Sequence, residues 1–224
     1  MNPYVTLALS GASIIFFIGY ILISKSNYYQ RFKMEYHMRN TFPYEFNYQG
    51  TFKDNLVGNL FLCLSFIISM ANYAMFDMTH SGFMIFVMVM GFFSSIMILV
   101  INFVPLKLLR GHIISSVLTL ISAFALPASL SIASFSIYNA NENKLALATA
   151  IISLVLTIFI FILLMNPNLT HWAQAEKKTN EDGTVTYIRP KYFVLAFTEW
   201  LCVITIIASQ ICLILMTFAM NYKV

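Results

Sequence analysis

Charged residues are scarce in this chain of 224 residues: Asp, Glu, Lys and Arg make up 10% of it, whereas hydrophobic residues make up 59%. The mean hydropathy is +0.78. A single soluble core of this size cannot bury so much apolar surface. A soluble globular domain is therefore excluded, and the lipid bilayer is the expected solvent.

Familiar catalytic and cofactor motifs are also absent. The sequence has no HExxH, GxxxxGK[ST] or GxSxG, and no paired histidines at helical spacing for haem or zinc. Its three cysteines lie in apolar runs and predict neither a disulfide framework nor a metal site. The net charge of +4 is not concentrated in a basic, aromatic-rich module. We therefore expect no cofactor, no metal and no nucleic-acid partner, and a conventional hydrolase, ATPase or haem protein is disfavoured.

Six apolar runs account for most of the chain, and each is long enough to cross about 30 Å of hydrocarbon at about 1.5 Å per residue. They cover residues 3–24, 56–76, 82–104, 113–138, 145–165 and 192–220. The expected fold class is all-α: a polytopic membrane protein with six transmembrane helices in one bundle. Residues 1–224 would form a single domain with polar loops at 25–55 and 166–191, the second containing short strand-like stretches around a turn at 180–183.

Basic residues are unevenly distributed between the two sides of this bundle. The odd-numbered loops carry Lys25, Arg31, Lys33, Arg39, Lys53, Lys107, Arg110, Lys177, Lys178, Arg189 and Lys191. The other side has only Lys144 and Lys223. The positive-inside rule therefore predicts cytoplasmic odd-numbered loops and both termini outside, and a cell membrane is the simplest location.

Glu199 is the most informative polar residue, because an ionised carboxylate inside a span is costly unless it is paired, hydrated or protonated. At 100° per residue, Gln210 and Thr217 point within about 20° of the Glu199 direction, and Asn221 points within about 40°. One polar stripe of the last helix should therefore face the bundle interior. Glu199 would either cross-link the bundle or take part in function.

Two further polar residues are expected near the same membrane face. Asn102 closes the third span and His112 opens the fourth, and alternating spans return to one side. Asn102, His112 and Glu199 thus form the candidate polar cluster. A histidine beside a carboxylate can shuttle protons, bind a lipid headgroup or act as an acid or base, whereas beside Arg110 it can equally be an interfacial anchor.

The fourth span carries Pro127 together with Ala125, Ser129 and Ala133 at four-residue spacing. Small residues at this spacing allow two helices to approach closely. A proline inside a helix can instead produce a kink that opens a cavity or a hinge. The sequence leaves both interpretations open.

Three short motifs lie at helix ends: Ile101-Asn102-Phe103, His112 at the next helix start, and Glu199-Trp200-Leu201 at the last helix start. Together they resemble the DRAM and FGF-receptor-activating-protein family of six-span proteins. The resemblance covers the order and spacing from the second helix to the end of the chain. Relatives act in autophagy modulation, GPI-anchor lipid remodelling and control of phosphoinositides or lipid asymmetry. The resemblance adds Phe103 and Trp200 to the candidate positions, and it implies a lumenal or extracellular first loop, opposite to the charge count.

These observations predict a lipid-interacting or regulatory membrane protein, with Gln210, Phe103 and Trp200 supporting the candidate cluster. The alternative is a small transporter or channel subunit, proton-coupled through Glu199 and His112. A third hypothesis is a lipid-modifying enzyme that uses these two residues as acid and base. Expected partners are membrane lipids, with further copies of the chain or other membrane proteins as additional candidates.

Overall fold

The computed structural model describes residues 2–47, 52–75, 82–105, 108–170, 176–179, 185–188 and 190–222. Its long helices are α1 (Pro3–Phe32), α2 (Leu56–Ala74), α3 (Met84–Phe103), α4 (Leu109–Asn141), α5 (Lys144–Leu164) and α6 (Val194–Asn221). Short 3-10 helices are η1 (Pro43–Phe46), η3 (Phe52–Asn55) and η5 (Pro167–Thr170). All six long helices are long and apolar enough to cross a membrane. The chain is an all-α, multi-pass integral membrane protein, as the apolar runs predicted.

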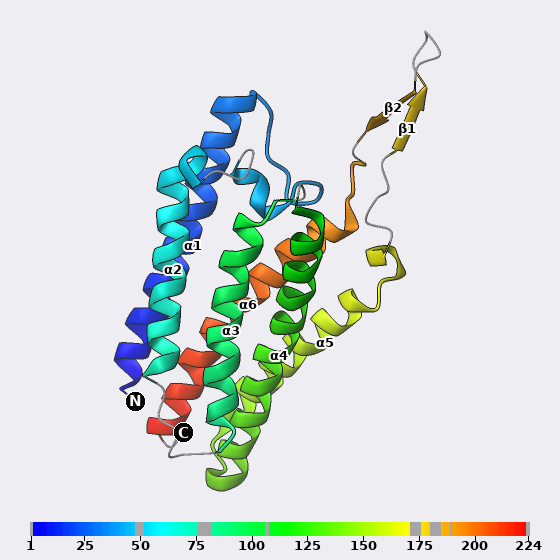
Figure 1. Cartoon of the computed structure of the whole chain (residues 1–224). Helices are drawn as coiled ribbons and strands as arrows, with labels where there is room; N and C mark the ends of the chain where they lie inside the picture. Colours follow the sequence, from blue (N-terminus) through cyan, green and yellow to red (C-terminus); the bar gives the residue numbers. More distant parts are fainter. Residues whose placement is uncertain are drawn as a thin grey trace.

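The six helices pack into one bundle, and the two ends of the chain lie at the same end of it (Figure 1). Helix α6 packs against α1, α4 and α5, while α1 pairs with α2 and α3 with α4. The most apolar window of α6 is 61% buried, against 28% for α1 and for α5. Helix α6 is therefore the central helix, and a polar residue on it meets protein rather than lipid.

The interior of the bundle combines a hydrophobic core with many polar residues, and its outer surface is apolar. Large hydrophobic side chains such as Ile15, Leu22 and Ile162 are more than half exposed, facing outward where lipid would cover them. Buried hydroxyl residues on several helices include Ser10, Ser13, Ser65, Ser69, Ser94, Ser95, Ser122 and Ser134. Because lipid solvates apolar side chains as well as a protein core does, helices in a membrane associate through close packing and polar contacts. The serines provide both.

Asn143 fixes the junction between α4, α5 and α6. Its side-chain oxygen accepts hydrogen bonds from the first amides of α5, Leu145 at 2.9 Å and Ala146 at 3.2 Å. Its amide nitrogen donates to the carbonyls of Ala219 and Tyr222 at the end of α6. One side chain thus satisfies the unpaired backbone groups of two helix ends.

The observed bounds differ from the predicted spans at several helix ends. Helix α1 continues to Phe32, eight residues beyond the predicted end of the first span at Ser24, so the predicted first loop begins inside a helix. Helix α4 begins at Leu109, which places His112 inside its first turn. Polar residues extend these helices because a helix does not have to end at the hydrocarbon boundary.

The polar segment before α6 contains a two-stranded hairpin that projects from the bundle (Figure 1). Strands β1 (Glu176–Thr179) and β2 (Val185–Ile188) pair antiparallel, with Glu176 opposite Ile188. The strand-like stretches are thus confirmed. The predicted turn at 180–183 lies outside the described residues, as do Lys107, Arg189 and Lys223 of the charge count.

Pro127 lies inside α4, which continues through it to Asn141. The small-residue stripe serves two purposes. Ala133 is fully buried in the bundle, whereas Ala125 and Ser129 line an apolar groove of about 350 Å³ that α3 and α4 form. Close packing is thus shown for Ala133, and the interpretation of Pro127 as a kink that opens a cavity or hinge stays a prediction.

Candidate functional site

His112 is held at the start of α4 by the end of α3. Its Nδ1 lies 2.8 Å from the carbonyl oxygen of Val104, the residue that follows α3. The side chain is only 2% exposed. Because a carbonyl oxygen can only accept a hydrogen bond, Nδ1 must carry a proton and donate it. The imidazole therefore presents its other nitrogen, Nε2, to the bundle interior.

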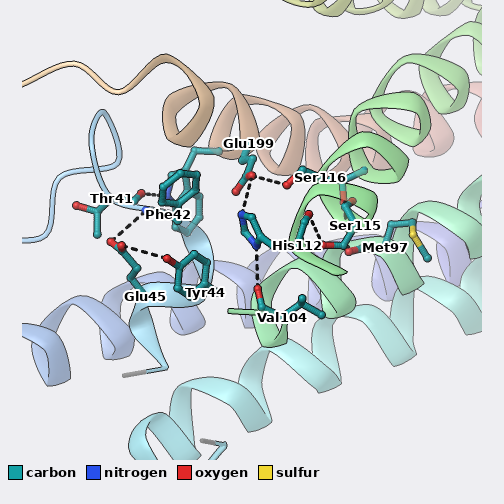
Figure 2. Close-up of polar contacts among 12 residues, drawn as sticks. Thr41, Phe42, Tyr44, Glu45, Met97, Val104, His112, Ser115, Ser116 and Glu199 are labelled. Atoms are coloured by element: carbon teal, nitrogen blue, oxygen red, sulfur yellow. Dashed lines mark hydrogen bonds and ion pairs between the residues drawn. The ribbon is translucent and has the colours of Figure 1, made fainter. Parts of the chain in front are cut away.

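Glu199 lies in the second turn of α6 and faces that nitrogen (Figure 2). Its Oε1 is 3.4 Å from His112 Nε2 and accepts a 2.7 Å hydrogen bond from the hydroxyl of Ser116, one turn further along α4. The carboxylate is fully buried. The carboxylate and its two partners thus join α6 to the first two turns of α4.

His112 Nε2 makes no hydrogen bond within the described residues, and its 3.4 Å contact with Oε1 is favourable when the pair carries one shared proton. With Nδ1 already donating to Val104, a neutral imidazole would direct the lone pair of Nε2 at a carboxylate oxygen, which is repulsive unless one of them is protonated. Either the imidazolium faces a carboxylate, or the imidazole faces a carboxylic acid. The pair has no net charge in both states, and this explains how it can be buried.

The second carboxylate oxygen, Oε2 of Glu199, has no hydrogen-bond partner in the described part of the chain. It is also buried. A buried carboxylate oxygen without a donor costs free energy, and such atoms in native structures are explained by strain, by a functional role, or by an ordered water or other bound group. The site can therefore accept one further hydrogen bond from a hydroxyl or an ammonium group.

An aromatic segment between α1 and η3 covers the pair, and we call residues 36–47 the lid segment. The rings of Phe42 and Tyr44 meet the His112 imidazole edge to face, with centroids 5.5 Å and 5.1 Å away. Phe42 also packs against Phe193, just before α6. The backbone amide of Phe193 donates a 2.9 Å hydrogen bond to the carbonyl of Arg39. Segments far apart in the sequence thus exclude water from the pair.

Trp200 fixes the lid segment to α6. Its indole Nε1 lies 2.9 Å from the carbonyl of Thr41 and 3.0 Å from the hydroxyl of Tyr36. The Tyr36 hydroxyl in turn donates to the carbonyl of Phe42 at 2.7 Å. Desolvation raises the pKa of the Tyr36 phenol well above its usual value, so this hydroxyl stays protonated at physiological pH. The position suggested by the family resemblance is thus a structural anchor of the lid segment.

Asn102 lies in a separate polar group. Its side-chain oxygen accepts a 2.5 Å hydrogen bond from Tyr20, and its amide donates to the carbonyl of Ile98. Its backbone carbonyl accepts from Asn47, at the end of the lid segment, at 2.9 Å. The structure thus brings His112 and Glu199 together, whereas Asn102 holds the lid segment to α1 and α3 instead. Phe103, next to it, is half-buried and packs against the core.

Gln210 forms a third polar group, three turns deeper along α6. Its side-chain oxygen accepts from Ser10 at 3.1 Å, and its amide donates to Ser69 at 2.7 Å and to Tyr73 at 3.1 Å. Asn72 lies 3.5 Å from the same oxygen. The inward-facing polar stripe predicted for α6 is confirmed for Glu199, Gln210 and Thr217, which are all buried, whereas Asn221 at the end of the helix is exposed. Gln210 links α1, α2 and α6 and has no contact with the His112–Glu199 pair.

Several residues of these groups were not among the sequence candidates. They are Tyr20, Tyr36, Asn47, Asn72, Tyr73 and Ser116. A helical spacing of polar residues, Ser65, Ser69 and Asn72, would have indicated the inner face of α2. The aromatic residues concentrated in the otherwise polar first loop would have indicated the lid segment.

The described residues contain no group of three or more His, Cys, Asp and Glu side chains that could hold a metal ion. No family model, no curated protein and no solved structure matches this chain. The likeness to the DRAM and FGF-receptor-activating-protein family therefore stays a prediction. Chemically, the site offers a shared proton, a hydroxyl and one unpaired acceptor oxygen in a dry environment.

Proposed function

We propose that this protein is a lipid-interacting membrane protein in which Glu199, together with His112, binds a lipid headgroup that carries a hydrogen-bond donor. The unpaired Oε2 of Glu199 is the observation that carries the proposal. A hydroxyl or ammonium group would satisfy this oxygen, and a hydrogen bond to a charged group contributes about 1.5–3 kcal/mol.

The depth of the pair supports a headgroup as the ligand. Glu199 follows the first residue of α6 by five residues, about 8 Å along the axis, and His112 follows the first residue of α4 by three, about 5 Å. The polar layer of a bilayer is about 5–8 Å thick on each side. With the first residues of α4 and α6 at the level of the headgroups, both side chains lie at a depth that a headgroup reaches once the lid segment moves aside.

Two lipids with identical chains test the proposal. Phosphatidylethanolamine offers N–H donors and phosphatidylcholine offers none. We expect the purified protein in detergent to bind dioctanoyl phosphatidylethanolamine at least fivefold more tightly than dioctanoyl phosphatidylcholine, which corresponds to about 1 kcal/mol. Native mass spectrometry of the bound lipid measures both affinities.

Two variants locate the interaction. Glu199→Gln keeps the shape but loses the charge that strengthens the hydrogen bond, so the preference should fall severalfold. Ser116→Ala is the matched control, because it removes a neighbour of Oε1 and leaves Oε2 in place. Equal binding of the two lipids to the unmodified protein, or an unchanged preference in Glu199→Gln, would contradict the proposal.

The shared proton favours a second candidate function, proton-coupled transport. A buried histidine and carboxylate that exchange one proton are typical of proton relays in transporters. This hypothesis predicts a proton flux into proteoliposomes under a pH gradient, which a pH-sensitive dye would report and which Glu199→Gln would abolish. A flux retained in Glu199→Gln would eliminate this role for Glu199.

The charge count supports an orientation with both termini outside and the lid segment at the cytoplasmic leaflet. Single cysteines at the exposed Thr179 and Asn141, in a background without native cysteines, test this orientation. We expect a membrane-impermeant thiol reagent to label only Asn141→Cys in intact cells. Labelling of only Thr179→Cys would place the lid segment at the outer leaflet or lumen, as the family resemblance implies.

A further inference from the structure

A second polar pocket lies at the same end of the bundle, between the last turn of α1 and the start of α2. It has a volume of about 440 Å³ and is lined by Asn27 and Arg31 of α1, Lys53 and Asp54 of η3, and the first residues of α2. The lid segment and the His112–Glu199 pair do not line it. The pocket is therefore a separate feature of the bundle.

The frame of this pocket is fixed by buried amides. Asn55 is 1% exposed. Its side chain accepts a 2.9 Å hydrogen bond from Asn27 and donates a 2.6 Å bond to Ser24. Gly58 makes this close approach possible, because a Cβ there would lie 2.5 Å from the Ser24 hydroxyl. The two helices are thus held together directly beneath the pocket.

The charges around the pocket favour an anion. Arg31 forms an ion pair with Asp54 at 3.2 Å, which positions its guanidinium at the rim. Lys53 is exposed and has no ion pair or hydrogen bond within the described residues. Two cations against one carboxylate leave one net positive charge. The pocket also lies at the first residues of α2, the positive end of its helix dipole.

An apolar surface continues from the pocket along α2. Leu56 and Val57 line it and are 48% and 51% exposed, on the side that lipid would cover. A phosphate beside Lys53 and Arg31 would thus have its acyl chains next to these residues. Basic pockets between transmembrane helices are typical binding sites for anionic headgroups.

We infer that this pocket binds a phosphate-bearing anion, with Lys53 and Arg31 as the cationic groups that contact the phosphate. An anionic phospholipid and a soluble phosphate ester share this chemistry. The site is independent of the headgroup site proposed at Glu199, which needs a donor rather than a negative charge.

Two lipids are the probes, dioctanoyl phosphatidylmethanol, which is anionic and has no hydrogen-bond donor in its headgroup, and dioctanoyl phosphatidylcholine. They are added to the purified protein in detergent and followed by native mass spectrometry. We expect the anionic lipid to bind more tightly and Lys53→Gln to weaken it by about fivefold, the effect of one lysine near a headgroup. Lys33→Gln is the matched control, because Lys33 is exposed beyond the end of α1 and does not line the pocket. Asp54→Asn should tighten binding, since it removes the competing carboxylate.

Two results would overturn the inference. One is unchanged phosphatidylmethanol binding in Lys53→Gln, and the other is equal weakening in Lys33→Gln, which would show that only the general surface charge matters. Competition by glycerol 3-phosphate identifies the source of the ligand. If it displaces the lipid at similar concentration, the pocket takes a soluble phosphate ester, and if it does not, the acyl chains contribute. Glu199→Gln should leave phosphatidylmethanol binding unchanged, because this lipid offers no donor to Glu199, so that this test and the test at Glu199 can fail separately.

Discussion

The contact between His112 and Glu199 can be measured as a coupling free energy. We expect Glu199→Met to destabilise the protein by about 1–3 kcal/mol, because it leaves the buried Nε2 of His112 without its partner. Ser116 loses its acceptor as well, but its hydroxyl can turn to the backbone carbonyl one turn earlier. The expected cost is therefore mainly that of the histidine.

A double-mutant cycle isolates the pairwise contribution. His112→Leu alone removes both the contact with Glu199 and the hydrogen bond to Val104, so the single cost contains more than the pair. The double variant Glu199→Met/His112→Leu should be less destabilised than the sum of the single variants by about 1–2 kcal/mol, the upper part of the range for polar contacts in membrane proteins. Glu199→Gln, whose amide nitrogen in the place of Oε1 can donate to both Nε2 and the Ser116 hydroxyl oxygen, should cost less than about 1 kcal/mol.

The native cysteines provide the assay. Cys202 and Cys212 on α6 are buried, whereas Cys63 is partly exposed. In a Cys63→Ser background, a short pulse of thiol-reactive dye during titration with a denaturing detergent therefore reports the unfolded fraction. Glu35→Met, at an exposed carboxylate, should change stability by no more than about 0.5 kcal/mol. If the destabilisation of the double variant equals the sum of the two single destabilisations within about 0.3 kcal/mol, the proposed interaction is refuted.

Three further predictions concern the groups around the pair. Trp200→Phe keeps an aromatic ring but removes the N–H donor. It should lower the free energy of unfolding by about 1 kcal/mol and speed hydrogen exchange in residues 36–47. Unchanged exchange would show that the indole does not hold the lid segment. Gln210→Met should lower the free energy of unfolding by about 2 kcal/mol, because it breaks three hydrogen bonds worth about 0.6 kcal/mol each in a membrane protein. Unchanged stability in the same thiol assay would refute the role of Gln210 in linking the helices. Gly91→Ala should cost about 1–3 kcal/mol, since its Cβ would overlap the ring of Tyr73; unchanged stability would show that the ring moves freely.

The sequence predicts the features that depend on one helix. The length and apolarity of the six runs gave the fold class, and the cost of a carboxylate in lipid identified Glu199 as buried. Alternation of spans placed His112 at the same end of the bundle. These inferences need only the periodicity of a helix and the thickness of a bilayer.

Features that depend on the rotation and relative height of several helices could not be predicted. Asn102 lies at the expected end of α3, but the rotation of that helix directs its side chain to Tyr20 rather than to His112. Gln210 lies on the expected face of α6, yet its partners on α1 and α2 depend on how the helices are packed. The sequence alone predicts only a loop for the lid segment. Its burial depends on tertiary contacts with Trp200.

The most direct test of the proposed headgroup site is a distance measurement by solid-state NMR. Proteoliposomes would contain protein with ¹³C-labelled glutamate side chains and phosphatidylethanolamine with ¹⁵N in its headgroup. The proposal predicts a dipolar contact between the headgroup nitrogen and the Glu199 carboxyl carbon, assigned by its loss in Glu199→Gln and retained in Ser116→Ala. A fully folded protein that shows no such contact at saturating lipid would contradict it.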